Sequence, residues 1–416
     1  MKIKRLLTAF LSILLVFTIL VNTVSCTAKI EATNLMDGVK RAEVTALDSI
    51  KEDNATVMDF ALRLFLATDN GENTLISPIS LLTALSMTLN GANGETKEQM
   101  QSVLGMTKEE LNLYLYTYLS SLSTDKENSL SLANSVWFKD DPNFTVDESF
   151  LQALADYYAA DAYKSPFDGV TLTDINNWVK NKTDKAIEKI VDDIPNEAVM
   201  YLVNALAFTA EWENAYEKGQ VQKAEFTNSD GTKSKIDLMC AAEGKYLDAG
   251  NATGFIKYYK DAKYSFVALL PNEGVSLADY LSTLDGDELS AALANAKNTK
   301  VMAGIPKFEA EYSAKMSAVL KEMGMPIAFD PENADFSALG AHAVGNIYIS
   351  EVFHKTYITV GEKGTKAGGA TAVEMAAKLS LSPEEVKTVY LTRPFVYMLV
   401  DCENNLPLFI GTVNEL

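Results

Sequence analysis

The residue types that carry out hydrolysis, group transfer or metal chemistry are scarce in this sequence. It has two histidines in 416 residues, His342 and His354. Neither has cysteines or carboxylates around it at the spacing of a metal site. No serine lies in the Gly-x-Ser-x-Gly pattern that exposes a nucleophile. We therefore interpret His354 as a structural residue, and we predict neither an enzyme, nor a metal site, nor a cofactor.

The glycine-rich segment 361–371 is the second place to look for chemistry. In a phosphate-binding P-loop, a lysine and then a serine or threonine follow the last glycine of the loop. Here the order is reversed, because Lys363 precedes Gly364 and Thr365. The segment is therefore not predicted to hold a nucleotide.

The same segment has the period of a β-strand. Every second side chain from Thr365 is uncharged, whereas the charges Lys366, Glu374 and Lys378 fall on the intervening positions. Successive side chains of a strand point to opposite faces, so this pattern predicts one buried face and one solvated face. Alanine and glycine are poor strand formers, however. The pattern therefore indicates a strand that forms only conditionally. The uncharged set is Thr365, Ala367, Gly369, Thr371, Val373, Met375 and Ala377.

Blocks on both sides of this segment resemble those of the serpins, inhibitors that trap serine proteases by inserting a cleaved loop into a sheet. The resemblance extends, in serpin order, over almost the whole chain after about residue 50. The blocks are Ser77–Ser80, Gly91–Thr96, Asn204–Phe208 with Trp212, Ile305–Phe308, Val352–Val360, Leu391–Val400 and Pro407–Gly411.

The resemblance implies an α+β fold with three β-sheets, about eight or nine helices and an exposed reactive-centre loop at about residues 362–390 of a domain spanning 51–416. It also implies a function, the suicide-substrate inhibition of extracellular serine proteases, with cysteine proteases as further targets. The residues implied for the hinge of the loop are Glu362, Gly364, Thr365, Ala367, Gly369 and Thr371. Those implied for the shutter and the breach of the main sheet are Ser77, Ser80, Asn204, Trp212 and His354.

Counting along the loop as in inhibitory serpins places the reactive bond between Lys378 and Leu379. A lysine before the cut favours trypsin-like proteases, whose acidic pocket pairs with it. The interval from Gly364 to Arg393 is a few residues longer than in the common family pattern. The alternatives are therefore cuts after Met375, Ala377, Leu379 or Leu381, which favour elastase-like or chymotrypsin-like enzymes.

The first residues have the layout of an export signal. A basic start at Lys2, Lys4 and Arg5 precedes an apolar run and small residues that lead to Cys26. Residues 23–26 resemble a bacterial lipoprotein box, although Thr23 stands where leucine is usual. We predict a signal peptide at 1–25, lipidation of Cys26 and a tether at 26–50. The product would be a lipid-anchored protein at a bacterial cell surface, with plain secretion or an uncleaved anchor as alternatives.

The overall charge limits the classes of partner. The formal net charge is −20, so binding to nucleic acid by bulk electrostatics is not expected. Heparin binding is not expected either, because the helix predicted at 107–122 has one lysine and is otherwise acidic, apolar or hydroxylated. We expect a monomer whose partner is the target protease. The alternative function is a non-inhibitory serpin-fold carrier at the cell surface.

The elements that position the loop are predicted from periodicity and apolar runs. Long strands are expected at 199–208 and 347–360. One strand is predicted at 301–308 and one helix at 313–323. Because helices come first and long strands dominate later, the order fits a mixed α and β domain rather than a regular βαβ repeat.

Overall fold

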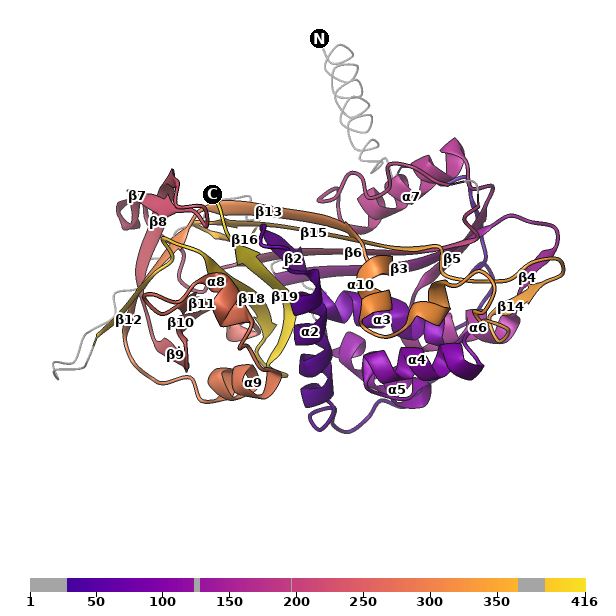
Figure 1. The fold of residues 1–416 in the computed structure, drawn as a ribbon, viewed down its shortest axis with the longest axis horizontal. Helices are drawn as coiled ribbons and strands as arrows, with labels where there is room; N and C mark the ends of the chain where they lie inside the picture. The colour runs from indigo at the N-terminus through magenta and orange to yellow at the C-terminus, as the bar shows by residue number, and fades with distance from the viewer. Residues whose placement is uncertain (1–27, 123–127, 196, 366–385) are drawn as a thin grey trace, which may run out of the picture.

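A seven-stranded sheet forms the central layer of the molecule. The computed structural model describes residues 28–122, 128–195, 197–365 and 386–416. Figure 1 shows the sheet almost edge-on, as a long layer across the view. In spatial order its strands are β1 (Thr33–Asn34), β5 (Asp161–Ser165), β3 (Asn128–Lys139), β6 (Met200–Glu211), β16 (Gly364–Thr365), β15 (Glu351–Gly361) and β13 (Phe308–Lys315).

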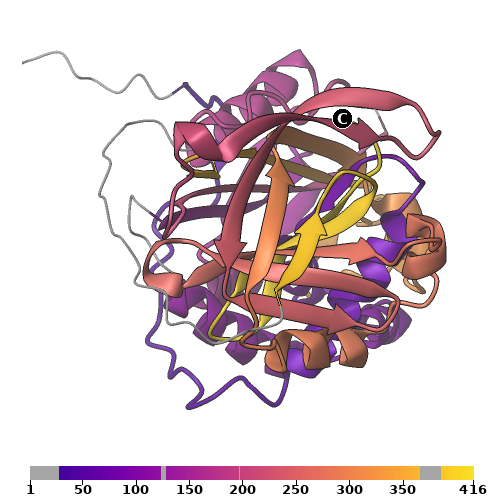
Figure 2. The same ribbon diagram turned by 90° about the vertical axis from the view of Figure 1, so that its left-hand side faces the viewer.

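Two further large sheets and a small one complete the β-structure of the described residues. The four-stranded sheet lies at one end of the molecule, where Figure 2 shows β12 beside β8. The six-stranded sheet consists of β2 (Thr74–Ile76), β19 (Leu406–Val413), β18 (Phe395–Asp401), β11 (Tyr264–Pro271), β10 (Ala252–Tyr258) and β9 (Lys245–Ala249). The four-stranded sheet consists of β17 (Lys387–Tyr390), β12 (Val301–Pro306), β8 (Lys233–Glu243) and β7 (Val221–Thr227), and the small sheet of β14 (Gly340–His342) and β4 (Phe144–Val146).

Nine α-helices are present in the described part of the chain, which confirms the predicted mixed fold. Helix α7 covers one face of the seven-stranded sheet, and α3 lies under the other (Figure 1). Every residue of α3 is buried, and its Pro78 occupies the first turn, where the missing N–H costs nothing. The helices are α2 (Asn54–Thr68), α3 (Pro78–Leu89), α4 (Gly94–Leu104), α5 (Lys108–Ser121), α6 (Glu148–Ala153), α7 (Gly169–Lys182), α8 (Leu277–Leu281), α9 (Gly286–Ala294) and α10 (Ser317–Glu322).

Strand β6 is buried on both faces because the seven-stranded sheet separates two hydrophobic cores. Leu202, Leu206 and Phe208 belong to the large core on the α3 side. The intervening Tyr201 and Val203 belong to a smaller core under α7. The sequence of a strand that is covered on both faces is a nearly continuous run of apolar residues. This is why β6 was predictable from the sequence.

Two element boundaries differ from the sequence prediction. The predicted strand at 301–308 is two strands in different sheets, since the chain leaves β12 at Pro306 and enters β13 at Phe308. Proline has no N–H to continue a ladder. The helix predicted at 313–323 was also wrong at its start. Strand β13 continues to Lys315 with alternating burial, and α10 begins at Ser317.

The predicted tether also differs from the structure over its described part, because residues 28–50 pack along the body of the domain. Strand β1 pairs with the edge strand β5. The carboxylate of Asp174 on α7 accepts hydrogen bonds from the backbone N–H groups of Glu31 and Ala32. Ile50 is buried. These contacts are made by backbone groups, so the side-chain pattern of the segment does not reveal them.

The predicted signal peptide at 1–25 and the predicted lipidation site, Cys26, lie outside the described residues. Among the helices that are described, none combines the length and the apolar character needed to cross a bilayer.

Candidate functional site

The central feature of the site is the seam where β6 and β15 pair directly. The two strands run parallel, with residues 201–207 of β6 beside 351–357 of β15. They are neighbours in space although about 150 residues of sequence separate them. A strand running the opposite way between them would be antiparallel to both. The strand directions at the seam would therefore allow one more antiparallel strand to be added, if β6 and β15 separated.

At the top of the seam, β16 already occupies this position. Gly364 and Thr365 pair antiparallel with Glu211 and Ala210 on one side, and with Gly361 and Val360 on the other. The chain thus turns at the end of β15 and starts back between the two strands. The hinge predicted at Gly364 and Thr365 is the place where it does so.

Only glycine fits at position 364. Its φ is +150°, and a Cβ built there would lie 2.0 Å from the carbonyl oxygen of Ala210. Real Cβ atoms do not approach a backbone oxygen so closely, so any side chain would push the turn out of the sheet.

Thr365 is fully buried, with 0% of its surface exposed. Its hydroxyl lies 2.6 Å from the hydroxyl of Tyr259 in a hydrogen bond. An exposed loop was predicted from about residue 362. The structure corrects this start, because Gly364 and Thr365 are inside the sheet. The cause is that the Thr365 side chain is small and finds a hydroxyl partner, so its burial costs little.

Trp212 closes the breach, which is the top of the sheet above β16. The indole is 3% exposed and stacks on Tyr259, with ring centroids 4.3 Å apart. Its Nε1 donates to the carbonyl of Gly361, and its backbone N–H donates to the carbonyl of Lys363. Trp212 therefore fixes both sides of the hinge turn, in agreement with its predicted position.

Glu362, also predicted for the hinge, lies in that turn. Its carboxylate is 2.8 Å from Nζ of Lys307. The hydrogen bond from Lys307 lowers the pKa of Glu362. Both side chains are more than a third exposed, so this pair contributes little to the free energy of folding.

Sequence reasoning missed Lys257, which is buried beneath the breach. Its side chain is 2% exposed, and Nζ lies 2.8 Å from the carboxylate of Glu243 and 3.1 Å from the carbonyl oxygen of Asn214. The same ammonium lies over the rings of Trp212 and Tyr216. A single lysine inside the apolar run 255–259 was the available signal, since lysine is almost never fully buried without a partner.

The predicted shutter residues meet below the hinge, where α3 begins. Residues Asn204 and His354 are adjacent in the register of the seam. The distance from His354 Nδ1 to Asn204 Oδ1 is 2.7 Å, and the Ser77 N–H donates to Nε2 of His354. Because Nε2 accepts, Nδ1 carries the proton and the imidazole is neutral. The amide of Asn204 donates to Ser80. The prediction that these four residues lie together is correct.

Two polar groups of the shutter lack partners within the described structure. The hydroxyl of Ser77 and the amide nitrogen of Asn134 are buried and make no hydrogen bond. Asn134 faces Asn204 across the β3–β6 ladder. Buried polar groups usually have a hydrogen-bond partner. The shutter therefore makes fewer hydrogen bonds than its polar groups allow.

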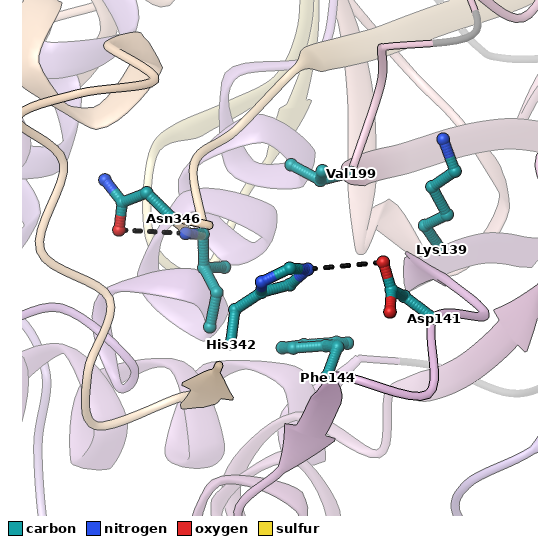
Figure 3. Close-up of a pocket in the computed structure, with 7 residues that line it drawn as sticks. Lys139, Asp141, Phe144, Val199, His342 and Asn346 are labelled. Atoms are coloured by element: carbon teal, nitrogen blue, oxygen red, sulfur yellow. Dashed lines mark hydrogen bonds and ion pairs between the residues drawn. The ribbon is translucent and has the colours of Figure 1, made fainter. Parts of the chain in front are cut away.

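His342, the other histidine, lies apart from the seam in the small β4–β14 sheet. Figure 3 shows it over Phe144, with Nε2 directed at Asp141 at 3.5 Å. The pocket beside these residues has a volume of about 20 Å³, which suffices for a water molecule but not for a substrate. No serine or cysteine lines it. The structure therefore adds no support for catalysis at His342.

The remaining predicted loop residues lie outside the described part of the chain. They are Ala367, Gly369 and Thr371 of the hinge, and Met375, Ala377, Lys378, Leu379 and Leu381 around the reactive bond. The next described residue is Val386, and the β17 strand that follows it pairs parallel with β12. The far end of the predicted loop is thus a strand of the four-stranded sheet.

The family model described as "Serpin (serine protease inhibitor)" matches residues 55–416. The chain belongs to the serpin family. An uncharacterized serpin-like protein of Thermococcus kodakarensis is 28% identical over 349 residues, which is 82% of this chain and 80% of that protein. Members of the family are mostly protease inhibitors rather than enzymes, in line with the scarcity of catalytic groups in this serpin.

Solved serpin structures confirm the fold. The native state of tengpin, a thermophilic serpin, matches with a TM-score of 0.89 and 46% identity, covering 93% of this chain and 100% of that one. The latent state of tengpin matches with a TM-score of 0.78 and 45% identity, covering 89% and 100%. This serpin is therefore more similar to the native structure than to the latent one.

The neutral His354 makes the stability of the serpin depend on pH. Burial lowers the pKa of His354 to about 3, whereas an unfolded histidine titrates near 6.5. The unfolded state therefore binds more protons below about pH 6.5, and stability falls as the pH drops toward 3. Between pH 7 and 5 we expect this histidine to account for a loss of about 2 kcal/mol. Guanidinium unfolding at both pH values checks this, with His354→Gln as the variant in which this part of the loss disappears.

The hydrogen bond between Tyr259 and Thr365 should stabilise the seated hinge. Replacing Tyr259 with phenylalanine removes it, at a cost of about 1 kcal/mol. We expect the amides of Gly364 and Thr365 to exchange about fivefold faster with solvent. Hydrogen exchange with mass spectrometry measures this. The matched control is Tyr216→Phe, because the Tyr216 hydroxyl belongs to the same breach but has no partner there. Equal acceleration in both variants would contradict the prediction.

Proposed function

We propose that this serpin is a suicide-substrate inhibitor of extracellular serine proteases. It acts through cleavage of the reactive loop and insertion of that loop into the β6–β15 seam. The observation that carries the proposal is the position of β16. A hinge that already runs between the two strands, with Thr365 buried, is prepared to continue downward as a new strand.

The register of β16 supports the proposal over the whole length of the seam. Gly364 and Thr365 stand opposite Glu211 and Ala210. If the ladder continues without a bulge, Met375 comes opposite Met200, the first residue of β6. The uncharged positions 367, 369, 371 and 373 then face the large core, opposite the buried Phe208, Leu206, Asn204 and Leu202. The strand period read from the sequence therefore matches the face that insertion would bury.

The two neighbouring strands are also in matching register. The pairing of β16 with β15, continued in the same way, brings position 371 opposite His354, which already stands beside Asn204. The strands β6 and β15 would only have to separate sideways, without sliding. In that position the hydroxyl of Thr371 would lie near the unpartnered Ser77 hydroxyl and Asn134 amide nitrogen of the shutter.

The chemical step belongs to the protease. Its serine oxygen attacks the carbonyl carbon of the residue before the reactive bond, and an ester forms as the peptide C–N bond breaks. The amine of the following residue leaves with a proton. The loop is then free to insert while its new end remains bound to the protease. Insertion before hydrolysis of the ester carries the protease toward the lower end of the seam.

Insertion is driven by the additional backbone hydrogen bonds that a new strand would form with β6 and β15. One parallel ladder is replaced by two antiparallel ladders, and each added hydrogen bond contributes about 0.5–1.5 kcal/mol. The uninserted state is then kinetically rather than thermodynamically stable. Before the loop can insert, the shutter and breach contacts of this state have to break and be replaced by contacts with the new strand.

We assign the reactive bond to Lys378 and Leu379, which makes trypsin-like proteases the first targets to test. The alternatives after Met375, Ala377, Leu379 and Leu381 are also compatible with the register. Each of them frees a strand long enough to reach Met200. We further propose that the protein acts outside the cell, anchored through a lipid on Cys26. The charged and apolar order of residues 1–25 supports export.

Covalent complex formation tests the function directly. The domain is incubated with trypsin, elastase, chymotrypsin and subtilisin, and the products are separated under denaturing conditions. We expect a complex that survives denaturation with at least one of them, and mass spectrometry of the released fragment locates the bond. Cleavage within 375–381 without any complex would instead favour a non-inhibitory carrier.

A charge at the first buried position of the loop should convert the inhibitor into a substrate. In Thr365→Arg the guanidinium would have to be buried next to Tyr259 and inside the sheet, which is costly without a counter-charge. We expect cleavage at the wild-type rate with at least a tenfold loss of covalent complex. The control is Lys366→Arg, which keeps a charge on the solvated face. Persistent complex formation by Thr365→Arg would contradict insertion.

A further inference from the structure

A pocket lies at the lower end of the seam, far from the hinge. Its volume is about 150 Å³, and it is formed where β6 and β15 begin. The segment before β6 lies beside it, and the Tyr348 hydroxyl donates to the carbonyl of Glu197 there. The lining includes Tyr201, Lys315, Glu351 and Phe353. These residues are not among the hinge, shutter or breach residues.

The pocket contains a buried donor without an acceptor. Tyr201 is 1% exposed, and its hydroxyl makes no hydrogen bond within the described structure. Its ring is held by stacking on Phe167 and by an edge contact with Phe353. Burial raises the pKa of Tyr201, so the hydroxyl keeps its proton at neutral pH and can donate it. An unpaired buried donor is unfavourable unless another state of the molecule uses it.

A cation lines the same pocket. Lys315 lies over the Phe353 ring, 5.9 Å from its centroid, and it also contributes, after Lys189, to the lowered pKa of Asp192. The carboxylate of Glu351, by contrast, already accepts from Ser317 and from the Val352 N–H. The pocket therefore offers an ammonium and a hydroxyl donor, beside the satisfied carboxylate of Glu351 and the exposed carboxylate of Glu197. Such a pair of donors suits an incoming carboxylate.

The register of β16, continued along the seam, indicates which carboxylate of the loop would reach this pocket. Continued from Thr365, the inserted strand has Glu374 opposite both Tyr201 and Glu351, on the face of the sheet that carries Phe353. Direct pairing with Glu351 is repulsive, so Glu374 needs donors close by. We propose that this pocket is the seat of Glu374 in the inserted loop, with the Tyr201 hydroxyl and the Lys315 ammonium as its partners. The inference rests on the proposed function, because it requires insertion.

The next charge of the loop supports the same alignment. Four residues further on, Lys378 would lie beyond Met200, the first residue of β6, at the end of the strand where the exposed Glu197 lines the pocket. Lys378 would thus lie toward a residue of opposite charge. A strand shifted by one residue would turn Glu374 and Lys378 toward the large core.

A double-mutant cycle in two states of the protein tests the proposal. Tyr201→Phe, Glu374→Ala and the double variant are compared with wild type, each before and after loop cleavage, by guanidinium unfolding. Cleavage C-terminal to Glu374 is verified by mass spectrometry. In the cleaved form we expect each single variant to lower the midpoint, and the double variant to lower it no further than the larger single effect. In the uncleaved form Tyr201→Phe should leave the midpoint unchanged.

Tyr397→Phe is the matched control, because the Tyr397 hydroxyl is also buried and unpartnered but belongs to β18, outside the seam. It should shift both forms equally. Additive effects in the cleaved form, or the same Tyr201→Phe shift in both forms, would overturn the assignment of the pocket. A wild-type midpoint that does not rise on cleavage would instead overturn the insertion mechanism itself, and with it this inference.

Discussion

The direct parallel pairing of β6 with β15 is the constraint on which the rest of the structure depends. Seven residue pairs join the strands, from Tyr201 beside Glu351 to Ala207 beside Tyr357. Because both strands run the same way, the sheet can accept one antiparallel strand between them, and β16 is the first part of it. The breach above and the shutter below are contacts that hold this pairing closed. In the proposed mechanism, the hinge advances only as these contacts are exchanged.

Some of the polar groups along the seam are hydrogen-bonded, and others are buried without a partner. At the shutter, neutral His354 and Asn204 are bonded to each other, while the Ser77 hydroxyl and the Asn134 amide nitrogen are left without partners. At the lower end the Tyr201 hydroxyl is also unpartnered. Unsatisfied buried groups are rare and call for an explanation in each case. These three groups lie beside the path that the proposed strand would take.

Charge is distributed differently along the same path. Lys257 is buried against Glu243 under the breach, where breaking the pair would leave an uncompensated charge. At the surface, the Glu362–Lys307 pair holds the hinge turn only weakly. The core-facing positions of the loop are uncharged from Thr365 to Met375. Desolvation of charge therefore opposes separation of Lys257 from Glu243 but does not arise on the core-facing side of the loop.

The sequence by itself determined the family, the mixed fold, and the alternation of charged and uncharged residues after Gly364, because these are local patterns that few folds satisfy together. It also identified Ser77, Ser80, Asn204 and His354 through family blocks. Only the tertiary structure decided that Thr365 is already buried, that Lys257 pairs with Glu243, and that residues 28–50 pack on the body. It also separated β12 from β13 at Pro306 and left the Tyr201 hydroxyl buried without a partner at the lower end of the seam. Each of these depends on which distant strands become neighbours, and register between strands that are far apart in sequence is set by packing of the whole sheet rather than by local propensity.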